Sequence, residues 1–205
     1  SGSGKSTLLK LLLKYYKPTK GVIEYDYMNI NQIPTEILRQ HMTCIMQESY
    51  LFDESIYYNI TLSHERVNKQ KFNMAVENTC LDEFINQFPA KYHTHIGKNG
   101  LSLSVGQRQQ IFLSRMIYKQ ANMIFLDEPT ESLDSILEHK ILRNLKQIYQ
   151  NKTMVLATHR ISRVKEFDHI IVLNKGEIQE QGTHESLMKL KSLYYCLVND
   201  ERASI

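Results

Sequence analysis

The chain has 205 residues, of which 42% are hydrophobic and 23% are charged, and its formal net charge is +3. This composition is ordinary for a globular protein, and the charge is too small to indicate nucleic-acid binding, so we expect no nucleic-acid partner. Cys44, Cys80 and Cys196 fit no metal-ligand spacing, which favours free thiols in a reducing compartment. No apolar run approaches the roughly 18 residues that a membrane-spanning helix requires.

The predicted elements alternate between helices and short buried strands. A helix is expected from Ser6 to about Tyr16 and another over 34–40, with strands over 21–26 and 43–46. Helical patterns then dominate residues 55–119. Apolar strands are then expected over 122–127, 152–158 and 168–173. A helix over 135–149 lies between the first two, and a hairpin turn at Lys175–Gly176 follows the last.

This order predicts an α/β fold, with a mainly parallel sheet flanked by helices. We expect a core formed by residues 1–48 and 120–205. An inserted α-helical subdomain should occupy residues 49–119.

The first residues, SGSGKST, match the end of the P-loop pattern G-x-x-x-x-G-K-[ST]. Glycines let such a loop bend until its backbone N–H groups surround a phosphate, and the following helix points its N-terminus at the same anion. Lys5 would reach the β- and γ-phosphates, and the Ser6 hydroxyl would bind Mg²⁺. The alternative is a Gly/Ser-rich turn with a chance lysine. The predicted nucleotide-binding residues of this loop are Ser1, Gly2, Ser3, Gly4, Lys5, Ser6 and Thr7.

A second signal is MIFLDEP, in which a buried strand leads directly into Asp127 and Glu128. Ligands of open α/β sheets collect at the carboxyl ends of strands. Asp127 suits a Mg²⁺-bound water, and Glu128 suits the polarisation of a water that attacks the γ-phosphate. Taken singly, either residue could instead cap the next helix.

The segment LSVGQRQQIFLSR (103–115) resembles the LSGGQ signature of ATP-binding cassette (ABC) ATPases. The resemblance implies a P-loop NTPase core, and a signature that caps the ATP held by the P-loop of a second cassette. Ser104, Gly106 and Gln107 would then contact that ATP. The alternative for this segment alone is a serine-capped amphipathic helix.

Further motifs follow in the order of the family. Gln47 resembles the Q-loop glutamine, which touches Mg²⁺ and the attacking water. PTESLDS (129–135) resembles the D-loop, in which Ser132 and Asp134 reach across the dimer. His159 resembles the switch histidine at the γ-phosphate. The resemblance thus implies Glu128, His159 and Gln47 as catalytic residues, and Ser6, Gln47 and Asp127 as the metal site.

The continuations of the Q-loop and of the signature resemble those of exporters whose ATPase is fused behind a transmembrane domain. This implies a homodimer or heterodimer of cassettes that hydrolyses ATP at the cytoplasmic face of the cell membrane. Alternatives are the ATPase subunit of an importer and a soluble ABC ATPase without a transport function. The leading P-loop glycine would fall two residues before Ser1, so we expect the chain to lack the N-terminal strands of such a cassette.

Three positions depart from the exporter pattern. His95 and Lys98 stand where exporters usually carry glutamates, beside the membrane domain. Val105 replaces the first glycine of the signature, and a β-branched residue restricts backbone angles that glycine leaves open. We therefore expect Val105 to weaken the contact with the partner's ATP without abolishing it.

Overall fold

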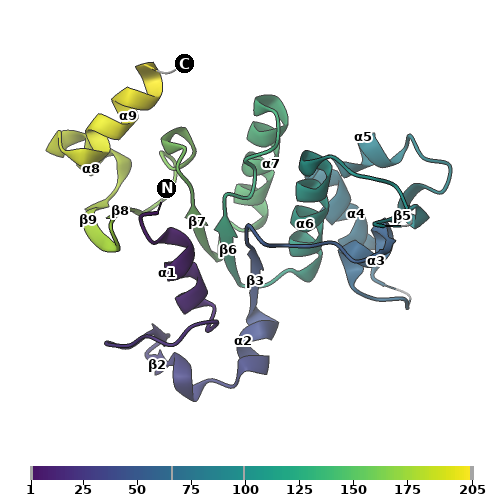
Figure 1. Cartoon of the computed structure of the whole chain (residues 1–205), viewed down its shortest axis with the longest axis horizontal. Coiled ribbons are helices and arrows are strands. Elements are labelled where there is room, and N and C mark those ends of the chain that lie inside the picture. Colours follow the sequence, from purple (N-terminus) through teal and green to yellow (C-terminus); the bar gives the residue numbers. More distant parts are fainter. Residues whose placement is uncertain (1, 66, 99, 204–205) are drawn as a thin grey trace. The chain divides into compact units, whose positions relative to one another are not determined.

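The computed structural model describes residues 2–65, 67–98 and 100–203 (Figure 1). Two compact units divide the chain, one formed by Ser1–Ile33 with Leu156–Ile205 and the other by Pro34–Val155. Each unit has its own hydrophobic core. The described residues include no helix that is long and apolar enough to cross a membrane.

The first unit joins the two ends of the chain. Its N-terminal part contains a leucine-rich helix and a small hairpin, which are connected because the Tyr25 hydroxyl donates a hydrogen bond of 2.8 Å to the Leu12 carbonyl. Its C-terminal part buries Ile170, Leu187 and Tyr194 in a separate core cluster. The elements are α1 (Lys5–Leu12), β1 (Glu24–Tyr25), β2 (Met28–Asn29), η1 (Ile30–Gln32), η3 (Ile161–Arg163), β8 (Ile170–Asn174), β9 (Glu177–Gly182), α8 (His184–Leu190) and α9 (Leu193–Ala203).

Two hairpins of this unit have different turn chemistry. The predicted turn at Lys175–Gly176 joins the antiparallel strands β8 and β9, with φ values of 50° and 81°. Residues 21–26, in contrast, form no single strand. They lead into the two-residue hairpin β1–β2, whose turn residues Asp26 and Tyr27 have φ values of 48° and 66°.

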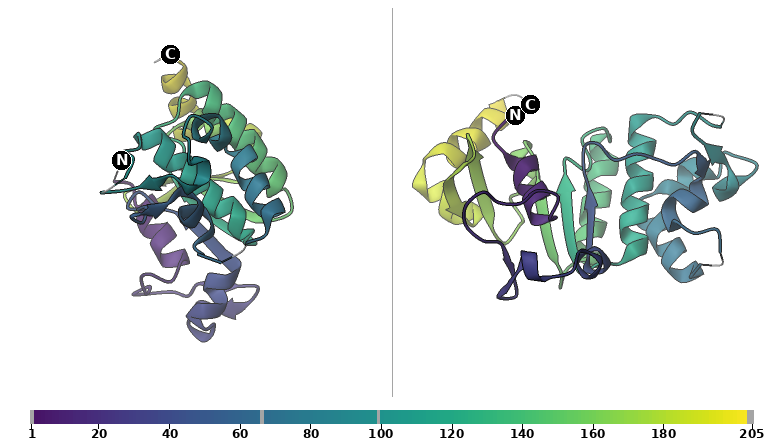
Figure 2. Two further views of the ribbon diagram at one scale, coloured as in Figure 1. Left: turned by 90° about the vertical axis from the view of Figure 1, so that its right-hand side faces the viewer. Right: turned by 60° about the horizontal axis from the view of Figure 1, so that its bottom comes forward.

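The second unit contains the strands β3 (Met42–Ile45) and β6 (Met123–Asp127), which pair in parallel with Ile45 opposite Leu126. Figure 2 shows these two strands side by side. The sheet order is β3-β6-β7, and β7 (Thr153–Ala157) begins in this unit. Most positions of β3 and β6 are buried, as expected for strands inside a parallel sheet, whereas β7 is fully buried only at Ala157.

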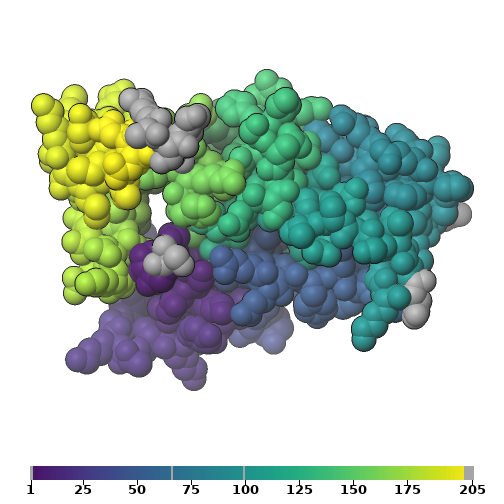
Figure 3. Space-filling view, turned by 45° about the horizontal axis from the view of Figure 1, so that its top comes forward, coloured from purple at the N-terminus to yellow at the C-terminus, as the bar shows by residue number. Residues whose placement is uncertain are grey.

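A helical lobe follows the first strand of this unit. It surrounds a core that includes Ile56, Leu81 and Ile111, each with no exposed surface. In Figure 3 the blue and teal residues of this lobe form one closely packed body. Its elements, and the helices that flank the sheet, are α2 (Thr35–His41), β4 (Glu54–Ser55), α3 (Ile56–Thr61), α4 (Lys69–Asn78), α5 (Leu81–Ile85), η2 (Lys91–His93), β5 (His95–Ile96), α6 (Val105–Lys119) and α7 (Ser135–Ile148).

Candidate active site

The opening loop lies in the first unit and has the conformation that its glycines permit. Gly2 and Gly4 have φ values of 77° and 97°, a region that residues with a Cβ rarely adopt. Gly4 is the N-cap of α1, and no side chain caps this helix. The first N–H groups of α1 therefore remain available for an anion.

Lys5 begins α1, and its Nζ donates a hydrogen bond of 3.3 Å to the Ser3 hydroxyl. Its amine thus lies back over the loop, where a phosphate would be held. Ser6 is half-buried and Thr7 is exposed in the first turn of the helix. Ser1, which was predicted to bind the nucleotide, lies outside the described residues.

The β8–β9 hairpin supports the loop, a contact that the sequence motifs do not predict. The Gly176 N–H donates a hydrogen bond of 3.0 Å to the Ser3 carbonyl. A Cβ on Gly4 would lie 3.4 Å from the Gly176 Cα, an ordinary van der Waals contact, so the two segments lie side by side. The hairpin turn therefore fixes one side of the P-loop.

His159 belongs to the same unit, just after β7, and is exposed. The turn that carries it is tightened by Thr158, whose Oγ1 accepts a hydrogen bond of 3.1 Å from the Arg160 N–H. The η3 turn (Ile161–Arg163) follows directly. The side chain thus stands on a short, ordered turn at the end of a strand.

In the second unit the parallel strands bring together Gln47 and the acidic pair. β3 ends at Ile45 and β6 at Asp127, and equivalent ends of parallel strands meet at one edge of the sheet. Gln47 lies in a turn that is closed on both sides, because the Ser49 hydroxyl accepts a hydrogen bond of 3.1 Å from the Met46 N–H. The Ser49 N–H donates in turn to the Met46 carbonyl at 3.0 Å.

Asp127 is 3% exposed, and its Oδ2 has no hydrogen-bond partner within the described part of the chain. A buried carboxylate oxygen is costly unless a cation or a donor meets it. A Mg²⁺ ion that is shared with nucleotide phosphates and water suits this oxygen, since magnesium sites of this kind use only one or two protein carboxylates. No group of three or more His, Cys, Asp or Glu side chains among the described residues is arranged to hold a metal by itself.

Glu128 follows with a φ of 50° and an exposed fraction of 7%. A non-glycine residue in this region costs of order 1 kcal/mol or more, and such residues gather at active sites. This left-handed residue directly follows the last residue of β6, so the chain leaves the strand at Glu128.

The signature segment forms the start of α6. The Ser104 Oγ accepts a hydrogen bond from the Gln107 N–H at 3.2 Å, and the Gln107 Oε1 accepts one from the Ser104 N–H at 2.9 Å. This capping box uses a lone pair of the serine but leaves its hydroxyl proton able to donate to a phosphate. The helix cap and an anion contact are therefore compatible.

Val105 is the first residue of α6 and does not have a positive φ. The backbone argument for its effect was therefore wrong, because this position needs only the helical angles that valine adopts. An effect of Val105 on the contact with ATP would therefore come from its side chain, which follows Ser104 and is 52% exposed.

We expect Val105→Ala to raise ATP turnover of the full-length protein as much as Val105→Gly does, since only the bulk of the side chain stands near the helix N-terminus. Steady-state ATPase rates of the three proteins test this. A rate that rises with glycine alone would restore the backbone argument, and unchanged rates in both would show that the valine has no effect.

The D-loop, residues 129–135, follows Glu128. Asp134 caps α7 by accepting hydrogen bonds from the Ile136 and Leu137 N–H groups at 3.1 and 3.0 Å. Its other carboxylate oxygen is not needed for this cap. The loop also contacts the signature: the Ser132 N–H donates a hydrogen bond of 3.1 Å to the Gln109 side chain.

Two groups of predicted residues are thus brought together in the second unit. Gln47 shares a sheet edge with Asp127 and Glu128, and the signature lies against the D-loop. The P-loop and His159 belong to the first unit.

Comparison with known proteins assigns these motifs to one family. A family model described as "ABC transporter" matches residues 1–131. The chain belongs to the ABC transporter family. It is 38% identical to the ABC multidrug transporter MDR5 of Trichophyton rubrum over 100% of the chain and 17% of that protein. It is 39% identical to the ATP-dependent lipid A-core flippase of Legionella pneumophila over 95% of the chain and 33% of that protein.

The solved structure of a bacterial Atm1-family ABC exporter with ATP bound superimposes with a TM-score of 0.93 at 31% identity. The match covers 98% of the chain and 36% of that exporter chain. These comparisons confirm the predicted P-loop α/β fold and an ABC cassette of the exporter kind, the class of domain that hydrolyses ATP in transporters. The chain spans at most about a third of the curated relatives described above.

Proposed function

We propose that this chain is the ATP-hydrolysing cassette of an exporter that works at the cytoplasmic face of the cell membrane. A transmembrane domain fused upstream would bind the transported substrate. Two cassettes, identical or different, would enclose two ATP–Mg²⁺ between the P-loop of one and the signature of the other. The names of the relatives and their greater length support this arrangement.

The residues suit distinct tasks in that reaction. The bent loop around Gly2 and Gly4 and the uncapped start of α1 would bind phosphate oxygens, and Lys5 would add a positive charge. Ser6, Gln47 and Asp127 would hold Mg²⁺. The bound ion would neutralise negative charge on the phosphates. Glu128 would accept a proton from the attacking water, and His159 would orient the γ-phosphate.

The domain division is part of the same proposal. Residues 1–48 and 120–205 would form the nucleotide-binding core, and residues 49–119 the helical subdomain that presents the signature. The helical core around Ile56, Leu81 and Ile111 supports a separate body for the latter.

The observation that carries the proposal is the buried Asp127 oxygen at the end of β6, beside the Gln47 turn. Asp127→Asn in the full-length protein should raise the Mg²⁺ concentration for half-maximal ATPase activity at least tenfold, a typical effect of weakening a metal site. A Mg²⁺ titration of the ATPase rate measures this. Asp168→Asn, an exposed aspartate of the first unit, is the matched control. An unchanged Mg²⁺ requirement in Asp127→Asn would contradict the proposed site.

A further inference from the structure

Within this cassette, the side chain of Gln109 joins the signature helix to the D-loop. The Gln109 Oε1 on α6 accepts a hydrogen bond of 3.1 Å from the Ser132 N–H of the D-loop. Beside it the two backbones nearly touch, since a Cβ on Gly106 would lie 2.9 Å from the Ser132 carbonyl oxygen. The apex of the D-loop therefore rests on the first turn of the signature helix.

The two ends of the D-loop are fixed by other bonds. At its start the Thr130 hydroxyl donates a hydrogen bond of 2.6 Å to the buried Glu138 carboxylate. At its end the cap made by Asp134 fixes the loop to α7. The apex at Glu131 and Ser132 is exposed, and the Gln109 side chain binds the Ser132 N–H of this apex to α6.

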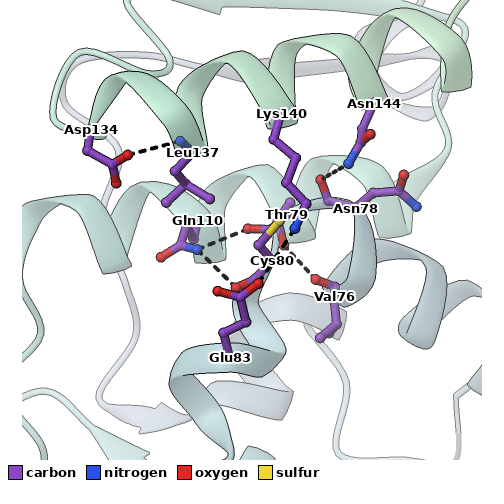
Figure 4. A network of polar contacts seen from close by, with 10 residues as sticks. All are labelled: Val76, Asn78, Thr79, Cys80, Glu83, Gln110, Asp134, Leu137, Lys140 and Asn144. Atoms are coloured by element: carbon purple, nitrogen blue, oxygen red, sulfur yellow. Dashed lines mark hydrogen bonds and ion pairs between the residues drawn. The ribbon is translucent and has the colours of Figure 1, made fainter.

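The bodies of α6 and α7 are held elsewhere, through the junction between α4 and α5 (Figure 4). The Gln110 Nε2 donates to the Thr79 and Cys80 carbonyls at 3.0 and 3.3 Å from one side. From the other side the Asn144 Nδ2 donates to the Asn78 carbonyl at 3.0 Å, one turn beyond Lys140.

Two more contacts strengthen this junction. The Thr79 and Ser114 hydroxyls are buried and 2.6 Å apart, which ties α4 to α6. The Lys140 amine lies 3.5 Å from the Glu83 carboxylate, which links α7 to α5. Because these bonds do not involve Gln109, its loss would free the Ser132 N–H of the D-loop without releasing either helix.

We propose that Gln109 is a positioning residue that keeps the D-loop apex in register with the signature helix. This rests on the proposed function, in which the signature encloses the nucleotide of the partner cassette, and on the expectation that Ser132 and Asp134 of the D-loop reach across the dimer. A D-loop that moved independently of α6 would reach that nucleotide less often when the signature closed on it. The effect belongs to closure of the dimer, not to the first binding of ATP at the P-loop.

The test uses the full-length protein in lipid nanodiscs, with Gln109→Leu to remove the acceptor and Gln109→Glu to retain it. Gln147→Leu, an exposed glutamine on α7, is the matched control. Hydrogen exchange of the peptide that contains Ser132 is measured without nucleotide, and kcat and KM for ATP are measured in the same preparations.

Gln109→Leu should accelerate exchange at Ser132 about fivefold, the factor that a hydrogen bond worth about 1 kcal/mol provides. Exchange within α6 and α7 should stay as in the wild type. The kcat should fall by a similar factor while KM changes less than twofold, and Gln109→Glu should restore both exchange and kcat.

Other results would overturn the inference. Unchanged exchange at Ser132 would show that Gln109 does not hold the loop, and faster exchange with an unchanged kcat would show that the bond positions nothing. A fall in kcat that Gln109→Glu does not rescue would indicate a general loss of structure. If the wild type hydrolysed no ATP, the proposed function and the catalytic part of this inference would both fail, whereas the exchange data would still decide whether Gln109 holds the loop.

Discussion

Glu128→Gln is expected to lower the ATPase kcat of the full-length protein by a factor of about 10²–10⁴, the contribution of a well-placed general base. Glutamine has nearly the same shape but does not accept the proton of the attacking water. The carboxylate lies just past the carboxyl end of β6, next to the buried Asp127, in a turn with a φ of 50°. Because the phosphate-binding loop is untouched, ATP should still bind and the ATP-bound dimer should accumulate.

Single-turnover hydrolysis and size-exclusion chromatography with ATP measure the two parts of this prediction. Glu36→Gln is the matched control, because Glu36 is an exposed glutamate of α2 that belongs to none of the motifs. Its turnover should stay close to that of the wild type. Hydrolysis by Glu128→Gln at the normal rate would mean that another residue serves as the base.

Features set by neighbours in the sequence could be predicted, and several were. Asp127 and Glu128 follow an apolar run, so their place at the end of a buried strand depends only on local pattern. The β8–β9 hairpin turn was predicted because Gly176 tolerates its φ of 81°. The β1–β2 turn was missed, since Asp26 and Tyr27 adopt positive φ angles without a glycine or asparagine to indicate it.

Contacts between distant segments could not be predicted in this way. Gln109 and Ser132 are 23 positions apart, and Gly176 and Ser3 meet from opposite ends of the chain. The contact of Gln109 could not be predicted from its residue type, because a glutamine on a helix is ordinary. The motif residues themselves carried chemistry that only certain side chains provide, and for that reason their roles could be proposed before the fold was known.

Another contact between distant segments is made by Asn59 of α3, which has no exposed surface. Its side chain accepts from the Phe52 N–H at 2.8 Å and donates to the Phe52 and Ser55 carbonyls at 3.0 and 3.1 Å. These bonds fix the segment that follows Gln47. The Arg115 Nη2 on the signature helix also donates to the Asn59 Oδ1, at 3.0 Å.

Arg115 is itself half-buried. Its Nε donates to the Asn59 carbonyl at 2.6 Å, and the guanidinium lies over the rings of Phe52 and Phe112, with centroids at 5.6 and 5.5 Å. Burial lowers the pKa of the guanidinium from its ordinary value, and the Tyr50 and Tyr58 hydroxyls oppose this. A charge in such surroundings depends on its remaining hydrogen bonds.

Asn59→Ala should therefore lower the opening free energy of the α3 and α6 amides by about 3 kcal/mol, because it leaves several buried backbone groups and one side of the guanidinium without partners. Native-state hydrogen exchange of the full-length protein measures this. The matched control is Asn68→Ala, which removes an exposed cap of α4 and should cost about 1 kcal/mol. Equal losses in the two variants would contradict the prediction.

Combining Asn59→Ala with Arg115→Met separates the charge from the backbone groups. Methionine keeps apolar packing between Phe52 and Phe112 but brings no charge into the lobe. The double variant should lose less than the sum of the two single variants, because the guanidinium that Asn59→Ala leaves underbonded is then gone. Strict additivity would mean that Arg115 and Asn59 stabilise the lobe independently, and that the segment after Gln47 is not coupled to the signature helix through this pair.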